Sequence, residues 1–191
     1  GLKLPTDQRW VDLAAYSLED ILTDHAYCEQ KAASNCISLI QRYPHRRKLV
    51  EELAPIVTEE WGHFRMVLSE LKKRNLHLGK QRKDEYVNAL QQHVQKGGHP
   101  EDRFLDHLLL FALIEARSCE RFRLLSEGLE DSSLKEFYRK FMISEAGHYR
   151  LFLDLAREYF EEERVRTRWL QWLAIEKEIL LHLDIRGDRM H

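Results

Sequence analysis

One six-residue pattern occurs twice in this chain and constrains its fold more than any other feature. Residues 60–65 read E-W-G-H-F-R, and residues 145–150 read E-A-G-H-Y-R. The glutamate and the histidine of each copy are three residues apart, a spacing that places both on one face of an α-helix. A further glutamate precedes each copy by 31 or 30 residues, Glu29 in the first case and Glu115 in the second. This doubled spacing predicts two helical hairpins, each with a glutamate on its first helix and Glu-x-x-His on its second.

Apolar residues recur at helical spacing along most of the chain. Pro55 should kink its helix rather than end it, because the apolar period continues on both sides. Gly128 should follow directly after the end of a helix, and the G-G-H-P run at residues 97–100 should break the chain. We expect long helices over residues 18–42, 45–74, 102–127, 132–161 and 165–183, with shorter ones around Trp10 and over residues 84–95.

The connections between these helices predict how they are arranged. Only a few residues separate the first long helix from the second, and the third from the fourth, so each pair should form an antiparallel hairpin. The two pairs are separated by a much longer connection, which lets the chain travel back along a bundle. We predict an all-α, ferritin-like four-helix bundle of two antiparallel hairpins joined by a long crossover, with additional N-terminal, crossover and C-terminal helices. A length of 191 residues suits a single such domain over residues 1–191.

The repeated glutamates all lie within apolar helical stripes and should therefore face the core. A buried carboxylate is unfavourable unless it is paired or binds a metal. Pairing with Arg65, Arg117 or Arg150 is one solution. Two divalent cations would balance four carboxylates, and carboxylate and imidazole donors suit iron or manganese. We predict a dimetal centre with these ligands: Glu29, Glu60, His63, Glu115, Glu145 and His148.

Composition excludes a protein that binds nucleic acid through its overall charge. Thirty Lys and Arg face 32 Asp and Glu, which gives a net charge of −2. Any RNA contact must therefore come from a local patch. Residues 72–83 contain six cations and no acid, and we expect phosphate contacts there, although such a loop is also typical of a solvated connector. The six cations are Lys72, Lys73, Arg74, Lys80, Arg82 and Lys83.

Hydropathy and cysteine usage indicate the compartment. The longest apolar run, residues 108–114, is far shorter than the ~20 residues of a membrane span. The three cysteines include no C-x-x-C pair, which argues against a disulfide framework and a rubredoxin-type metal site. We expect a cytoplasmic protein with no membrane partner.

Four short segments of the sequence, considered together, point to a known protein family. They are L-P-T-D at residues 4–7, D-H-A-Y-C-E at 24–29, L-I-E-A-R-S-C-E-R-F at 113–122 and S-E-A-G-H-Y at 144–149. With these segments the chain resembles the MiaE family of tRNA hydroxylases from about residue 4 to residue 178. The resemblance implies the same six metal ligands and a non-haem di-iron monooxygenase. Such an enzyme uses O₂ to hydroxylate the isopentenyl group of 2-methylthio-N-6-isopentenyladenosine next to the anticodon in tRNA.

The resemblance also implies partners and cofactors. They are tRNA, two iron ions, O₂ as co-substrate, and an external electron donor such as a reductase or a ferredoxin-type protein. The residues alone leave an alternative, a ferritin-like iron-storage or peroxide-scavenging protein that uses the same ligands without an RNA substrate. A non-enzymatic helical scaffold is a third hypothesis, and metal content distinguishes it from the other two.

Overall fold

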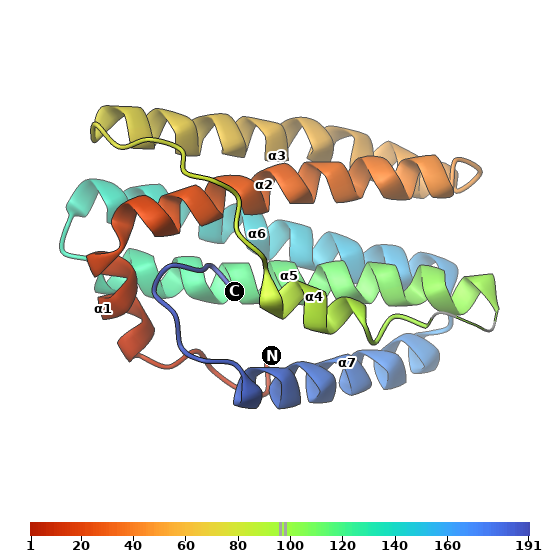
Figure 1. Ribbon diagram of the computed structural model, residues 1–191. Helices are drawn as coiled ribbons and strands as arrows, with labels where there is room; N and C mark the ends of the chain where they lie inside the picture. The colour runs from red at the N-terminus through yellow and green to blue at the C-terminus, as the bar shows by residue number, and fades with distance from the viewer. Residues whose placement is uncertain (96, 98) are drawn as a thin grey trace. The chain divides into compact units, whose positions relative to one another are not determined.

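The computed structural model describes residues 1–95, 97 and 99–191. Within these residues the chain forms helices and no strand, which confirms the all-α prediction (Figure 1). Gly98, part of the predicted chain break, lies outside the described residues. The helices are α1 Arg9–Tyr16, α2 Leu18–Arg42, α3 Arg47–Lys73, α4 Glu85–Gln91, α5 Pro100–Gly128, α6 Ser132–Tyr159 and α7 Glu162–His182.

The chain divides into two compact units. One comprises residues 1–11, 84–185 and 191, and the other comprises residues 12–83 and 186–190. Each unit contains one of the two predicted hairpins: α5 with α6 in the first, and α2 with α3 in the second. The two antiparallel hairpins and the long crossover are therefore confirmed, while the single domain over residues 1–191 stays a prediction.

In the second unit, α2 and α3 lie side by side as neighbouring antiparallel helices (Figure 1). Apolar side chains at helical spacing are buried along both helices, for example Leu22 and Ala26 on α2 and Leu53 and Val67 on α3. Pro55 lies inside α3, which continues on both sides of it as expected. Burial of this apolar stripe supplies the main favourable free energy for holding the hairpin together.

The segment after α3 runs back along α2, where the yellow chain crosses it in Figure 1. His77 donates its backbone N–H to Glu19 Oε1 at 2.9 Å, and Gly79 donates to Thr23 Oγ1 at 3.1 Å. Tyr27 in turn donates its hydroxyl to the Gly79 carbonyl at 3.0 Å. The crossover is thus held to α2 by polar contacts, as a connection without secondary structure must be.

In the first unit, α5 and α6 form the other hairpin, and α7 packs against α5. The α6 N-terminus is capped by Asp131, whose side chain accepts the N–H groups of Ser133 and Leu134. Gly128 is the last residue of α5 rather than the residue after it, so that prediction was wrong. A Cβ at this position would lie 2.8 Å from Val11 Cγ1 on α1, so close packing favours a glycine here.

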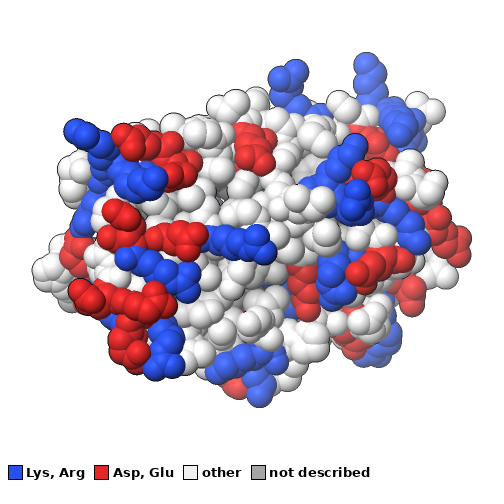
Figure 2. Space-filling view, turned by 180° about the vertical axis from the view of Figure 1, so that it is seen from behind, with Lys and Arg blue, Asp and Glu red and all other residues white. Residues whose placement is uncertain are grey.

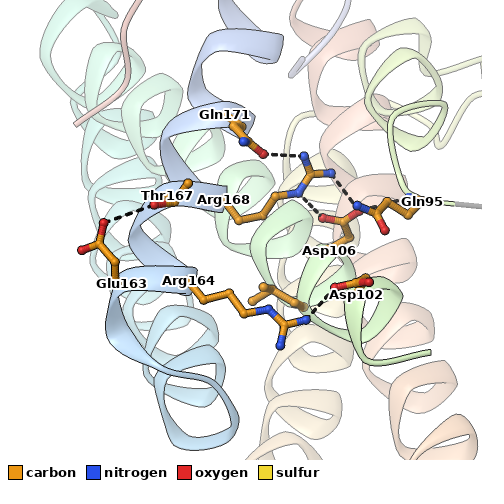
Figure 3. A pocket seen from close by; sticks show the side chains of 9 residues that line it. Gln95, Asp102, Asp106, Glu163, Arg164, Thr167, Arg168 and Gln171 are labelled. Carbon is orange, nitrogen blue, oxygen red and sulfur yellow. Dashed lines mark hydrogen bonds and ion pairs between the residues drawn. The ribbon is translucent and has the colours of Figure 1, made fainter. Parts of the chain in front are cut away.

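One fully buried and one partly buried ion pair join α7 to α5. Arg117 on α5 lies 2.9 Å from Glu176 on α7, and neither side chain is exposed. Elsewhere along these helices, Arg168 makes a bidentate pair with buried Asp106 (Figure 3). Asp106 also accepts the indole N–H of Trp172 at 3.1 Å. This second pair borders a pocket of about 280 Å³ lined by residues of both helices and by Gln95, most of them polar. Each pair fixes α7 at a defined register, because a buried charge needs its partner.

Lys and Arg are interspersed with Asp and Glu over the face shown in Figure 2, as the net charge of −2 leads one to expect. Among the described residues, no helix has the combination of length and apolar character that a membrane span requires.

Candidate metal centre

The α2–α3 hairpin brings three of the predicted ligands together. Glu29 comes from α2, while Glu60 and His63 come from α3, one turn apart. His63 Nδ1 lies 3.2 Å from Glu60 Oε2 and 3.4 Å from Glu29 Oε2. Both carboxylates are buried, and the His63 side chain is 12% exposed. One nitrogen and two oxygen donors therefore converge from two helices.

These separations fit a single metal ion. Donor atoms bound at roughly 2 Å from one ion, in adjacent positions, lie about 3 Å from each other. The two distances from His63 Nδ1 are close to that value. The donor set is also suitable, because two carboxylates and one imidazole match the preferences of iron and manganese.

A fourth side chain in this hairpin supports Glu29. His25 lies one turn earlier on α2, is fully buried, and places Nε2 2.6 Å from Glu29 Oε1. The other oxygen of Glu29 is the one near His63. His25 was not among the six predicted ligands, although its position four residues before Glu29 on the buried stripe was a usable signal. A hydrogen bond to one oxygen orients a carboxylate for binding through the other.

The α5–α6 hairpin carries the second copy of the set. Glu115 on α5 and both Glu145 and His148 on α6 are buried. His148 Nδ1 lies 3.7 Å from Glu145 Oε2, a slightly wider separation than in the first copy. This hairpin thus also presents two buried carboxylates and one imidazole, the same donor set.

Aromatic side chains lie one turn from the second set on each helix. Phe111 precedes Glu115 by four residues on α5, and Phe152 follows His148 by four on α6. The two ring centroids are 5.6 Å apart. Cys119 lies one turn after Glu115, where burial raises the pKa of its thiol and the Glu145 carboxylate raises it further. Both effects disfavour the thiolate form of Cys119. An apolar lining of this kind limits water access to a bound metal.

The arginines that offered an alternative to metal binding have different partners or positions. Arg117 pairs with Glu176 and Glu120, not with Glu115. Arg65 and Arg150 are both exposed. Neutralisation of the repeated glutamates by these arginines is therefore not what the structure shows.

The six cations of residues 72–83 fall into two groups. Arg74 lies 2.6 Å from Glu70, with Lys73 3.7 Å from the same carboxylate, and Arg82 lies 3.0 Å from Asp188. Within the described part of the chain, the remaining three cations are exposed and make no ion pair: Lys72, Lys80 and Lys83. Only this second group is immediately available for phosphate contacts.

Comparison with known proteins identifies the family to which this chain belongs. The family model described as tRNA-(MS[2]IO[6]A)-hydroxylase (MiaE) matches residues 1–191. A tRNA 2-(methylsulfanyl)-N(6)-isopentenyladenosine(37) hydroxylase from Pseudomonas putida is 37% identical over 161 residues, which cover 84% of this chain and 77% of the relative. The protein of the same name from Salmonella typhimurium is 28% identical over 239 residues, covering 100% of this chain and 87% of the relative.

A solved structure shows the same fold. It is described as Protein 43 with aldehyde deformylating oxygenase activity from Synechococcus, and it is 35% identical to this chain. The TM-score is 0.93, with 100% of this chain and 94% of the other covered. This likeness confirms the ferritin-like fold class. Because the family model spans every residue and the named relatives match over most of their length, this chain belongs to the MiaE family of tRNA hydroxylases.

Proposed function

We propose that this protein is a non-haem di-iron monooxygenase that hydroxylates the isopentenyl group of 2-methylthio-N-6-isopentenyladenosine next to the anticodon in tRNA. The observation that carries the proposal is the doubled donor set. Each hairpin buries two carboxylates and one imidazole at the positions of the sequence repeat. Family membership supports tRNA hydroxylation as the reaction.

The six ligands of this centre are Glu29, Glu60, His63, Glu115, Glu145 and His148. Charge supports two metal ions, because two divalent cations neutralise four carboxylates and remove the cost of burying them. When bound, iron would supply the activation of O₂ that hydroxylation of a carbon–hydrogen bond requires. We assign O₂ as the co-substrate on the same ground.

The protein's own residues contribute orientation and exclusion of water. His25 holds one oxygen of Glu29, which leaves the other directed toward His63. The buried aromatic side chains near the second donor set, including Phe111 and Phe152, provide an apolar surface suited to an isopentenyl tail. Excluding water also protects the reacting centre from side reactions.

The overall stoichiometry requires a further partner. One oxygen atom of O₂ enters the new C–OH group and the other leaves as water, so two electrons and two protons are consumed in each turnover. We propose that an external reductase or ferredoxin-type protein supplies the electrons. We place the reaction in the cytoplasm, in keeping with free cysteines and a tRNA substrate.

The decisive experiment is mass spectrometry of nucleosides from tRNA incubated with iron-loaded protein, O₂ and a two-electron donor. Wild type should increase the mass of the isopentenylated nucleoside by one oxygen atom. Glu145→Gln should lose both bound iron and hydroxylation, whereas Glu158→Gln, a matched exposed position on the same helix, should lose neither. Oxidation of ferrous iron with no change in the nucleoside would favour the iron-storage alternative.

A further inference from the structure

One side of α3 carries an exposed tryptophan in line with two cations. Trp61, Arg65 and Lys72 are spaced at i, i+4 and i+11, so they share one face of the helix. The Trp61 side chain is 47% exposed. We call these three residues, with exposed Thr58 and Ser69 beside them, the α3 strip.

The α3 strip contains no acid. Glu59 and Glu70 belong to the other side of the helix, where Glu59 Oε1 lies 3.8 Å from His63 Nε2 and Glu70 binds Arg74. Within the described part of the chain, Arg65 and Lys72 make no ion pair. The strip therefore presents two available positive charges with no carboxylate between them.

The exposure of Trp61 has no explanation in the fold. Trp10 and Trp172 are buried in the core, as large aromatic side chains usually are. The second copy of the repeat has Ala146 at the position of Trp61, so the hairpin does not require an aromatic residue there. The Trp61 indole packs in a tilted arrangement against buried Phe64, with ring centroids 4.9 Å apart. The ring is thus anchored while much of its surface stays in solvent.

An exposed aromatic ring beside available cations is the combination that binds single-stranded RNA. Unpaired bases stack on exposed aromatic rings, while nearby cations contact the phosphates. The 11 residues from Trp61 to Lys72 span about 16 Å of helix, the length of about five stacked nucleotides. Trp61 also follows Glu60 directly, so a base stacked on it lies within about one helix diameter of that carboxylate.

We propose that the α3 strip docks the anticodon loop of the substrate tRNA, with an unpaired base stacked on Trp61 and phosphates bound by Arg65 and Lys72. This inference rests on the proposed function, because it names the surface that the RNA uses. It assigns the strip to RNA rather than to a protein partner, since a base-stacking ring flanked only by cations complements a polyanion.

The test uses a fluorescently end-labelled anticodon stem–loop RNA that contains the isopentenylated adenosine, with binding followed by anisotropy. Trp61→Ala should raise the Kd about tenfold, the loss typical of one stacking interaction. Trp61→Phe should recover part of the affinity, because a smaller ring still stacks. Tyr16→Ala, which removes another strongly exposed aromatic ring, should bind like wild type.

The cations are tested by salt dependence. Arg65→Gln combined with Lys72→Gln should reduce the slope of log affinity against log salt by about 1.4, since each phosphate contact to a single strand contributes about 0.7. All variants change exposed side chains, so their melting temperatures should equal that of wild type. Melting temperatures that fall together with affinity would overturn the assignment, because they would indicate a structural role.

The outcomes separate this inference from the proposed function. Absence of binding by wild type would refute the RNA substrate itself. Binding by wild type with unchanged affinity for Trp61→Ala would refute the α3 strip while leaving the function intact. Unchanged RNA affinity with a raised KM for the electron donor would also overturn the proposal, since it would identify the strip as a protein-docking surface.

Discussion

The buried pair of Arg117 and Glu176 should be among the most important polar contacts for the stability of this protein. Both side chains are 0% exposed. Glu176 Oε1 accepts hydrogen bonds from Arg117 Nε at 2.9 Å and from the Tyr86 hydroxyl at 2.8 Å. Arg117 also donates to the Leu4 carbonyl at 2.9 Å and pairs with Glu120. The pair therefore joins α5 and α7 with the N-terminal segment and α4.

Glu176→Gln removes the negative charge with little change in shape. Breaking a buried ion pair costs about 3–5 kcal/mol, because one charge remains buried without its partner. Arg117 keeps Glu120, so the lower end of this range applies, about 3 kcal/mol. For a chain of this length each kcal/mol lowers the Tm by about 2–4 °C, so we expect a decrease of about 6–12 °C.

Differential scanning calorimetry measures this decrease, with Glu178→Gln at an exposed position of α7 as the matched control. A double variant, Arg117→Met with Glu176→Leu, should melt nearer to wild type than Glu176→Gln, because neither of the two fully buried charges remains. A second readout is the phenol of Tyr86, whose pKa is raised by burial and then by the Glu176 carboxylate. Glu176→Gln should lower that pKa. Equal melting temperatures for Glu176→Gln and Glu178→Gln would refute the reasoning.

Three further predictions concern the site and its substrate. His25→Phe should weaken binding of ferrous iron at least tenfold by titration, whereas His25→Gln, which keeps a hydrogen-bond donor, should retain most of the affinity. Replacing Lys72, Lys80 and Lys83 with Ala should flatten the salt dependence of tRNA binding by about two units of slope at unchanged Tm. As a contrasting control for this lysine variant, Arg82→Ala should lower the Tm, because its guanidinium binds Asp188. Hydroxylation under ¹⁸O₂ should label the product, since the new oxygen comes from O₂.

For each of these three predictions, one outcome would contradict it. Equal iron affinity for His25→Phe and wild type would show that His25 is not needed to orient Glu29. If the triple lysine variant has the same slope of log tRNA affinity against log salt as wild type, residues 72–83 act only as a connector between helices. Product oxygen that derives from water would indicate hydrolytic metal chemistry instead of a monooxygenase.

Local information in the sequence was enough for the helices, the hairpins and the repeated donor set. The predicted helix over residues 18–42 has the same bounds as α2, because helical periodicity and the Tyr43-Pro44 stop are properties of neighbouring residues. The Glu-x-x-His spacing likewise predicted that Glu60 and His63 lie together, since residues three apart share a helical face. Burial of the repeated glutamates followed from the same periodicity.

Partners that are distant along the chain were decided only by the tertiary structure. Arg82 belonged to a uniform basic segment in the sequence, but folding brings it to Asp188, 106 residues away. Gly128 was expected beyond the helix, yet it is the last residue of α5, where Val11 packs so close that a Cβ would clash. The hydrogen bond between His25 and Glu29 depends on which side-chain rotamers the core permits. Periodicity determines which face of a helix is buried, but the partner that each buried or charged group meets is determined by how the helices pack.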